Sequence, residues 1–443
     1  MLQCKRIIEI HNFGPVEHTI VDLNKTYQIY IGAQASGKST ICKAIYFCEK
    51  LRDYSLTFLL EETQSLYDSS TNAWGSYMNY LKKQFMGCFG KTTHMRPFDI
   101  CYQFGEHKIS ITLKEGFVNF HFSENLFGEM HALIRDACGI QKRINRVDGS
   151  VTIFDKLNEY QMMKQQFQRH LEKLFSDDKE IVYIPAGRSL LATLSEQLQE
   201  YSVAEMDLTM QEFITLIRRT KNQFGSKIPE IIKEYTKTVD GRIDKDAVDK
   251  AYELIKKILK ADYTSDSEGE KMYFDEYHWV KLMYSSSGQQ EVLWILMLLF
   301  VLILQKKSAF VVIEEPEAHL FPIAQRNVVQ FITLMANVTS SNVLLTTHSP
   351  YILTSANILL YSSQVEKGND EVVVPENMRI NGDIFAAYKV LYDVEHGSKI
   401  ESIFDKEEAL IDTEYIDEVS GITNRELLHT RQCVEKDTDL DVG

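Results

Sequence analysis

The sequence lacks the cysteine spacings from which disulfide frameworks and zinc sites are built. Its seven cysteines are odd in number, scattered, and never arranged as C-x-x-C. Both kinds of site need paired or closely spaced cysteines. We therefore expect reduced thiols and a cytoplasmic protein. The seven are Cys4, Cys42, Cys48, Cys88, Cys101, Cys138 and Cys433.

Long apolar runs are also missing. The longest, at residues 292–304, has 13 residues, whereas a helix that spans a bilayer needs about 20. Residues 1–10 mix charged and apolar side chains and contain no small-residue cleavage site of a signal peptide. We expect a buried helix at 292–304, and neither secretion nor membrane contact.

Basic residues are in deficit. The chain has 48 Lys and Arg against 63 Asp and Glu, a net charge of -15, so any nucleic acid must bind at a local basic patch. Apolar residues (44%) and charged residues (25%) are present in ordinary proportions, which excludes a disordered or collagen-like chain. The 443 residues suit about three domains of roughly 150 residues or one large domain with insertions.

The hydrophobic periodicity predicts an α/β fold. Strand-like and helical runs alternate in the second half of the chain, which is typical of a mostly parallel sheet. An antiparallel meander is expected at 99–122, and helices at 195–259. Strands are predicted at 7–10, 19–23, 27–31, 180–184, 272–274, 280–283, 309–313 and 343–346, and further helices at 39–52, 154–175, 292–304 and 325–336.

A phosphate-binding loop follows the strand at 27–31. Residues 32–39 satisfy G-x-x-x-x-G-K-[ST] between an apolar strand and a helix. Backbone N–H groups at a helix N-terminus bind phosphate, a lysine contacts the terminal phosphates, and the last hydroxyl is a ligand of Mg²⁺. The motif thus predicts a bound nucleotide phosphate with Mg²⁺ as cofactor, Lys38 as a catalytic residue and Ser39 as a metal ligand. The predicted nucleotide-binding residues here are Gly32, Ala33, Gln34, Ala35, Ser36, Gly37, Lys38, Ser39 and Thr40.

Two carboxylates end the apolar strand at 309–313. Glu314 and Glu315 fit a Walker B element, in which one acid lies near the hydrated Mg²⁺ and the next orients or deprotonates water. We assign the metal to Glu314 and the catalytic base to Glu315. The alternative is that these acids and Glu317 merely favour a helix start.

The next apolar strand leads to Thr346-Thr347-His348-Ser349-Pro350. Because the ends of parallel strands meet at one edge of a sheet, His348 is expected beside the same carboxylates, as a catalytic residue that contacts phosphate or water. A third segment, with Ser286, Ser287 and Gly288, opens the apolar helix and offers hydroxyl and N–H groups for an anion. By itself this segment is equally a helix cap.

Taken in order, these four motifs resemble the ATP-binding cassette (ABC) type ATPase heads of the SMC, RecF and OLD (overcoming lysogenization defect) classes. The opening residues 8–15 are similar to the first strand of those heads. The resemblance implies a two-lobed P-loop head that binds ATP between two subunits, with Ser286, Ser287 and Gly288 of one subunit capping the nucleotide held by the other. A homodimer or higher homo-oligomer is therefore expected.

The chain departs from the family pattern in three places. Gln34-Ala35 replaces Asn-Gly, the signature reads Ser-Ser-Ser-Gly-Gln, and Glu314 replaces Asp. None of these changes removes a required chemical group. In these heads a glutamine after the first lobe couples the nucleotide to the arms, and Gln103 and Gln141 are both candidates.

Residues 183–189 are similar to a segment of stand-alone ATPases found in phage-defence operons. Arg188 would reach a phosphate or a partner, or it is a solvated turn residue. OLD nucleases also carry a Toprim domain with Asp-x-Asp after a strand, and here that pattern occurs only at 437–441. The acids between 405 and 418 read as a solvated face or docking surface, and the basic clusters 142–146 and 218–221 as solvated faces or phosphate contacts.

The resemblance divides the chain into four ranges. Residues 1–190 are the N-terminal half of the head, 191–262 a helical insertion, 263–365 the half with signature, Walker B and histidine, and 366–443 an acidic extension that is a candidate docking surface. The implied function is ATP hydrolysis that controls a separately encoded effector, a nuclease, in prokaryotic anti-phage defence. The alternatives are a DNA clamp of the RecF or SMC kind and an autonomous OLD-like nuclease.

Overall fold

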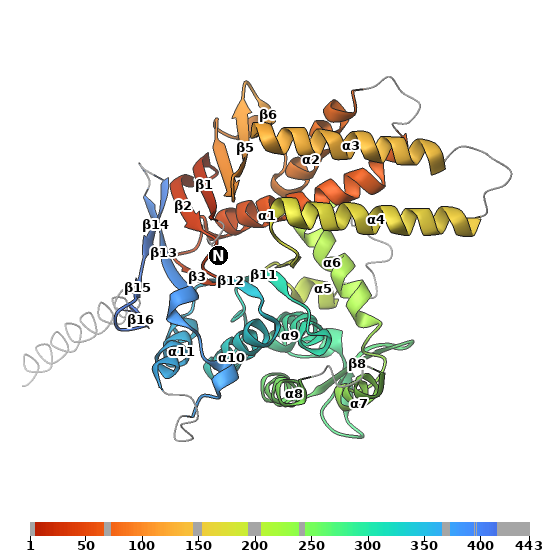
Figure 1. Cartoon of the computed structure of the whole chain (residues 1–443). Helices are drawn as coiled ribbons and strands as arrows, with labels where there is room; N and C mark the ends of the chain where they lie inside the picture. Colours follow the sequence, from red (N-terminus) through yellow and green to blue (C-terminus); the bar gives the residue numbers. More distant parts are fainter. Residues whose placement is uncertain are drawn as a thin grey trace, which may run out of the picture.

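The computed structural model of the chain describes residues 5–65, 72–144, 153–193, 205–238, 244–365, 373–393, 395 and 397–413. Within these ranges one mixed sheet of eleven strands runs through the molecule (Figure 1). In spatial order its strands are β6 (Phe117–Phe122), β5 (His107–Lys114), β4 (Asp99–Phe104), β1 (Arg6–Phe13), β2 (Val16–Asp22), β14 (Gly397–Ser402), β13 (Phe385–Asp393), β3 (Tyr27–Ile31), β12 (Asn342–Thr347), β11 (Ala309–Glu314) and β7 (Glu180–Ile184).

The two ends of the sheet differ in strand direction. Strands β13, β3, β12, β11 and β7 are parallel, whereas β6, β5, β4, β1 and β2 are antiparallel. Strand β14 joins the halves, since it is antiparallel to β13 and parallel to β2. The predicted α/β fold with parallel strands and an antiparallel lobe is confirmed, and the lobe belongs to the same sheet.

The parallel strands are apolar because both of their faces are covered. All residues of β3 and β11 are buried, as expected for strands with helices on each side. Strands β1 and β2 instead alternate: Ile8 and Ile10 are buried, while Glu9 and His11 are half-buried. The continuous apolar pattern of β3 and β11 and the alternating pattern of β1 therefore distinguish the parallel half of the sheet from the antiparallel half.

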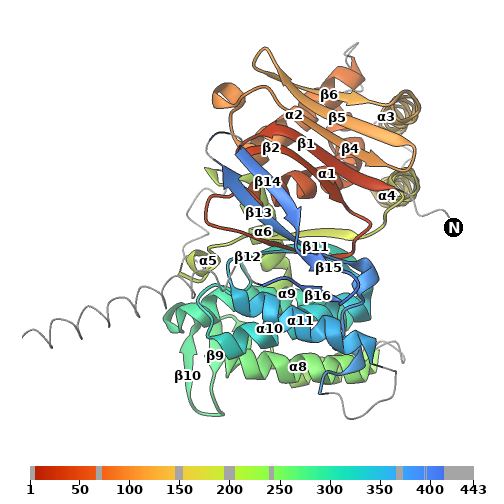
Figure 2. The ribbon, with the colours of Figure 1, turned by 90° about the vertical axis from the view of Figure 1, so that its left-hand side faces the viewer.

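Helices of the antiparallel lobe pack around the long helix that follows the phosphate loop. This helix, α1 (Lys38–Leu60), exceeds the predicted 39–52 because Tyr54 and Phe58 continue its buried face. Phe47 lies against Phe85 at 5.3 Å between ring centroids, within a buried aromatic group. The lobe helices are α2 (Ala73–Phe89), α3 (Glu124–Ile144) and α4 (Ile153–Phe175); Figure 2 shows α3 and α4 on the side of the sheet away from α8–α11.

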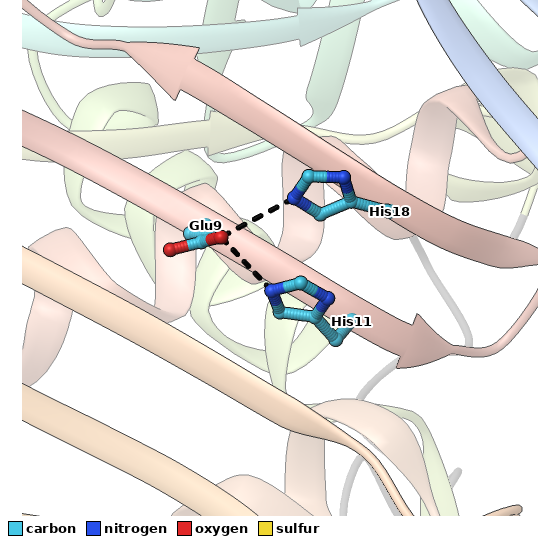
Figure 3. Close-up of side chains that lie close together, drawn as sticks. All are labelled: Glu9, His11 and His18. Atoms are coloured by element: carbon cyan, nitrogen blue, oxygen red, sulfur yellow. Dashed lines mark hydrogen bonds and ion pairs between the residues drawn. The ribbon is translucent and has the colours of Figure 1, made fainter.

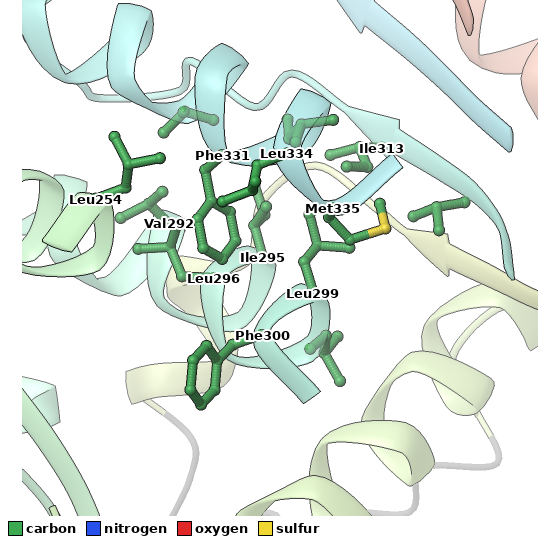
Figure 4. Packing of buried hydrophobic residues seen from close by; sticks show 14 of the residues in the cluster. Leu254, Val292, Ile295, Leu296, Leu299, Phe300, Ile313, Phe331, Leu334 and Met335 are labelled. Atoms are coloured by element: carbon green, nitrogen blue, oxygen red, sulfur yellow. The ribbon is translucent and has the colours of Figure 1, made fainter. Parts of the chain in front are cut away.

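The other layer is built around a helix with no solvent-facing side. Helix α9 (Ser287–Gln305) is buried from residue 290 to 304, and its apolar side chains contact neighbours from three elements (Figure 4). Among the described residues it is the one helix long and apolar enough to cross a membrane, and 89% of that window is buried inside the protein. The predicted buried helix at 292–304 is thus confirmed. Its layer also holds α10 (Pro322–Thr339) and α11 (Pro350–Tyr361).

The predicted helices at 195–259 are present as three separate helices. Their apolar faces, which include Phe213, Ile217 and Leu254, join the same hydrophobic cluster as α9. These helices therefore complete the core beneath the sheet, while the division of the chain into four ranges stays a prediction. The helices are α6 (Leu208–Lys221), α7 (Ile228–Thr238) and α8 (Lys245–Leu259), preceded by the short α5 (Ser189–Thr193).

The strands predicted near 272 and 280 do not join the main sheet. They form, with a preceding strand, a separate antiparallel sheet of β8 (Asp262–Asp266), β9 (Gly269–Tyr273) and β10 (Trp279–Lys281). Short turns at 267–268 and 274–278 connect these strands. Parallel pairing would need a much longer crossover connection, so the strands pair in antiparallel fashion.

Within the acidic extension predicted at 366–443, residues 385–393 and 397–402 form two strands of the main sheet. Strand β13 lies between β14 and β3, in the middle of the sheet. Its apolar residues Phe385, Ala387 and Val390 are buried, although the sequence around them is acidic. The strands β15 (Phe404–Asp405) and β16 (Leu410–Ile411) follow. The Asp-x-Asp pattern at 437–441 lies outside the described residues, as do the acids beyond 413.

Candidate functional site

The phosphate loop connects β3 to α1 and is shaped by two glycines. A Cβ added to Gly32 would lie 2.3 Å from the carbonyl oxygen of Val390, so no other residue fits. Gly37 has φ of 98°, a left-handed conformation that favours glycine, and it lies against Pro15 and Ser398. The loop geometry therefore depends on segments far away in the sequence.

Lys38 is the buried cation of the loop. Its side chain is 5% exposed, and Nζ donates to the carbonyl oxygens of Gly32 at 3.0 Å and Ala33 at 2.9 Å. Burial lowers the pKa of Lys38, and the carboxylates of Glu315, Glu317 and Glu314 act in the opposite direction. Residues 33–35 and Ser39 are exposed, which leaves the loop tip and the Ser39 hydroxyl open to a ligand.

Glu314 is the last residue of β11, and only one of its two carboxylate oxygens has a hydrogen-bond partner among the described residues. The parallel register places it beside Thr346 of β12. Its Oε2 accepts from the N–H of Ala186 at 3.2 Å, while Oε1 is buried and has no hydrogen-bond partner within the described residues. A buried unpaired carboxylate oxygen is costly and, together with the Ser39 hydroxyl, matches the oxygen ligands that Mg²⁺ prefers. The oxygen atoms of Ser39 and Glu314 are therefore chemically suited to bind Mg²⁺, and their assignment as metal ligands stays a prediction.

The structure brings Glu315 and His348 together. Nε2 of His348 lies 3.3 Å from Oε1 of Glu315, and the side chains are 35% and 39% exposed. The backbone of Glu315 is left-handed, with φ of 44°, and its N–H donates to the carbonyl oxygen of Thr346 at 3.0 Å. This turn points the carboxylate out of the strand end toward the loop that carries His348.

Glu317 fixes the position of the loop that carries His348 by hydrogen bonds. One of its carboxylate oxygens accepts from the hydroxyl of Thr347 and from the N–H of His348, both at 2.7 Å. Burial raises the pKa of Glu317. In the sequence this residue reads only as a favourable helix-start acid, whereas in the structure it fixes the backbone that presents His348.

Arg188 is neither solvated nor placed to reach a phosphate or a partner, so both readings of it are wrong. The side chain is fully buried. Its guanidinium donates to the carbonyl oxygens of Glu291 at 2.8 Å, Pro185 and Glu314 at 2.7 Å, and Glu315 at 2.9 Å. The Glu291 carboxylate, 3.4 Å from Nε, balances the charge. Arg188 thus joins the end of the Walker B strand to the apolar helix α9.

Glu291 has a role that the sequence did not reveal. It directly precedes the apolar run at 292–304 and belongs to no motif, yet its carboxylate accepts from the backbone N–H groups of Arg188 and Ser189, each at 3.0 Å. A charged residue next to a long apolar run is the one sequence signal that indicates a buried partner for Glu291.

The signature residues lie at the exposed start of α9. The Ser286 hydroxyl accepts from the N–H of Gln289, whose side chain returns to the Ser286 backbone, forming a capping box. Ser286 and Ser287 are exposed, and a Cβ on Gly288 would lie 2.7 Å from the carbonyl oxygen of His319. Among the described residues, no hydrogen bond or ion pair joins this segment to the phosphate loop of the same chain.

The candidate coupling glutamines differ in position. Gln141 donates to the carbonyl oxygen of Leu60, the last residue of α1. At about 1.5 Å per residue, the 23-residue helix places this point about 33 Å from Lys38, which excludes Gln141 as a nucleotide contact. Gln103 lies in β4, opposite Ile7, and its role stays a prediction.

Together these groups define a P-loop nucleotide-binding site at the carboxyl ends of parallel strands. A family model described as AAA ATPase domain matches residues 6–224 and 140–353. The chain therefore belongs to the AAA ATPase domain family, and the predicted ATPase head is confirmed. Membership implies that ATP is the nucleotide bound.

Solved structures give weaker matches. The crystal structure of an SMC head bound to the C-winged helix domain of ScpA aligns with 94% of this chain and 100% of that chain, at 13% identity and a TM-score of 0.41. The SMC head domain from Thermotoga maritima aligns with 91% and 100%, at 11% identity and a TM-score of 0.37. A comparison with curated proteins found no match.

Proposed function

We propose that the chain hydrolyses ATP in a Mg²⁺-dependent reaction. The observation that carries this proposal is the contact between Glu315 and His348, 3.3 Å apart at the strand end next to Glu314. A half-exposed carboxylate beside an imidazole is suited to hold water by hydrogen bonds and to accept its proton. A chain that only bound nucleotide would not need this pair.

Each residue has a separate task in this reaction. Mg²⁺, when bound by Ser39 and Glu314, neutralises charge on the phosphates. The Lys38 ammonium exchanges its carbonyl partners for the terminal phosphate oxygens. Glu315 orients the attacking water and takes its proton, while His348, fixed by Glu317, donates to the developing charge or to the water.

A direct test compares single variants of these residues. Lys38→Ala should lose nucleotide binding, because the buried cation is removed. Glu315→Gln should bind ATP and hydrolyse it at least about a hundredfold more slowly. Phosphate release is the measurement, and Glu407→Gln, an exposed acid in a turn, is the matched control. Equal hydrolysis by wild type and Glu315→Gln would overturn the assignment of the base.

The proposal includes closure of two heads on ATP. Three exposed aromatic residues support it: Tyr284 (73% exposed) precedes the signature, Phe321 (76%) follows the Walker B turn, and Tyr351 (51%) follows the histidine loop. Exposed aromatic side chains are enriched at protein interfaces. Each is adjacent in sequence to a segment that a second copy would have to cover.

The oligomeric state with nucleotide tests head closure. Glu315→Gln with ATP should sediment as a dimer, and with ADP as a monomer. Adding Ser286→Arg to this variant should abolish the dimer, because the bulky cation stands at the exposed cap position. Ser402→Arg, at an exposed strand end, is the control. A dimer that persists with Ser286→Arg would contradict the signature contact.

Closure would control a separately encoded effector, a nuclease, in anti-phage defence. Support for this comes from the resemblance of residues 183–189 to stand-alone defence ATPases. The test is capture of Glu315→Gln with ATP from its native host. A co-purifying nuclease without nucleic acid supports the effector switch, whereas DNA without a protein partner favours a clamp and contradicts the defence role.

The DNA clamp would use the basic clusters. Lys142 and Arg143 are exposed at the end of α3, while Lys221 of the second cluster is already paired with Glu270 at 2.5 Å. Cleavage of DNA by the pure chain with Mg²⁺ or Mn²⁺ would instead indicate an autonomous nuclease.

A further inference from the structure

Three potential metal ligands converge on the first hairpin of the chain, away from the phosphate loop residues. Glu9 and His11 lie on β1, and His18 on β2 (Figure 3). The antiparallel register pairs His11 directly with His18, and residues two apart on a strand share a face. Glu9 and both histidines therefore point from the same side of the sheet, where their side chains are 39–50% exposed.

The ligand atoms are already close enough to share one ion. Oε1 of Glu9 lies 2.9 Å from Nε2 of His11 and 3.2 Å from Nε2 of His18, and all three atoms fall within 4.8 Å of one another. A tetrahedral zinc ion with metal–nitrogen distances of about 2.0–2.1 Å holds its ligands roughly 3.3 Å apart. The two distances from Oε1 of Glu9, 2.9 Å and 3.2 Å, are close to that value.

The two histidine rings are arranged in parallel. Their centroids are 4.3 Å apart with an interplanar angle of 12°, and both Nε2 atoms lie within hydrogen-bond distance of the same oxygen, Oε1 of Glu9. With its proton on Nδ1, each ring has a lone pair on Nε2, and a tilt of the two rings toward each other directs both lone pairs to one ion beside Glu9.

We propose that Glu9, His11 and His18 form a binding site for a divalent transition-metal ion of the zinc type. Two imidazoles and one carboxylate suit zinc and its neighbours, whereas Mg²⁺ and Ca²⁺ prefer oxygen ligands alone. Three protein ligands leave a fourth position open to water or to a group of another molecule. This site is separate from the proposed Mg²⁺ site at Ser39 and Glu314.

The scaffold of the site is firm and connects to the nucleotide loop. Strand β1 is paired on its other side with β4, which holds the hairpin in the sheet. The hairpin turn reaches the loop: a Cβ on Gly14 would lie 3.2 Å from Thr40, and one on Gly37 would lie 3.0 Å from Pro15. An ion that cross-links β1 and β2 thus stiffens a segment that packs against the start of α1.

The site is tested by zinc titration of the full chain, prepared without an oligohistidine tag, treated with chelator and kept free of Mg²⁺ and nucleotide. Calorimetry should show one ion bound per chain, and the melting temperature should rise with zinc. When Co²⁺ is bound in place of zinc, the protein should show the visible absorption bands of four-coordinate cobalt. His18→Ala should weaken binding at least about tenfold and remove the zinc-dependent rise in melting temperature.

Two variants provide matched controls. His121 is an exposed histidine of β6 in the same sheet, and Cys101 lies opposite Glu9 on β4. His121→Ala and Cys101→Ser should bind zinc as the wild type does. Metal-free melting temperatures of all variants establish that His18→Ala is folded, as expected for an exposed position.

Two results would overturn the site. One is zinc binding by His18→Ala and His11→Ala with wild-type affinity. The other is loss of binding in Cys101→Ser with a thiolate charge-transfer band in the cobalt spectrum, which would move the ion to the neighbouring strand. Neither measurement uses ATP, so failure of this site and failure of the proposed ATPase are distinguishable.

Discussion

The hydroxyl of Ser398 donates to the carbonyl oxygen of Ser36 at 2.6 Å, across 362 positions of sequence. The N–H of the same residue donates to the carbonyl oxygen of Pro15 at 2.7 Å. Ser398 is 1% exposed and lies on β14, the strand between the parallel and antiparallel halves of the sheet. It therefore ties the phosphate loop to both halves.

Ser398→Ala should weaken nucleotide binding without unfolding the chain. The net value of one hydrogen bond is about 1 kcal/mol, which corresponds to roughly a fivefold rise in the dissociation constant of a nonhydrolysable ATP analogue. Ser402→Ala, at the exposed end of the same strand, should leave it unchanged. An unaltered affinity in Ser398→Ala would show that the loop holds its shape without β14.

Arg188→Met should destabilise the protein strongly. The substitution leaves the Glu291 carboxylate buried without its cation, and loss of one partner of a buried ion pair costs about 3–5 kcal/mol. Denaturant unfolding is the measurement. Arg188→Lys keeps the positive charge but loses the guanidinium hydrogen bonds to the carbonyl oxygens of Glu314 and Glu315. Its free energy of unfolding should therefore lie between those of the wild type and Arg188→Met. Arg96→Met, at an exposed position, is the control for loss of charge.

Removal of the Glu317 carboxylate should change how stability depends on pH. The pKa of Glu317 is raised above its ordinary value of 4.5 by burial, so the folded state binds more protons than the unfolded state between these two pKa values. Stability therefore falls as pH rises through the raised pKa. The free energy of unfolding of wild type relative to Glu317→Gln should increase on acidification from pH 7 and level off below about pH 4.

The same variant also tests the role of Glu317 in the site. The amide oxygen of Gln can still accept from Thr347 and from the backbone of His348, so we expect ATP hydrolysis to be reduced by less than in Glu315→Gln. Measured turnover in the two variants provides the comparison. A larger loss in Glu317→Gln would reverse the assigned roles of base and support.

His348→Ala should reduce the rate of hydrolysis while leaving ATP affinity close to that of the wild type. Its imidazole contacts Glu315 rather than the phosphate loop, and general acid–base contributions are typically about a hundredfold or more. Single-turnover rates and analogue binding separate the two effects. A large loss of ATP binding with a normal rate of turnover would show instead that His348 contacts a phosphate of bound ATP and has no role in the hydrolysis step.

Much of the site followed from local sequence. The phosphate loop, the Glu314–Glu315 pair and His348 each end an apolar strand, and parallel pairing then requires those ends to meet. Arg188 was misread because its partners are backbone carbonyl oxygens of residues 314 and 315, which carry no sequence signature. The acidic composition after residue 383 likewise concealed β13.

By itself, the sequence determined the P-loop, the strand and helix periods and the buried helix at 292–304. These are local properties, fixed by residue type and spacing along a short segment. Only the tertiary structure decided that β13 and β14 close the sheet beside the loop, that Arg188 holds the Walker B end, and that Glu9, His11 and His18 share one face. Such relationships depend on strand order and register, because pairing between distant segments is set by how the whole core packs.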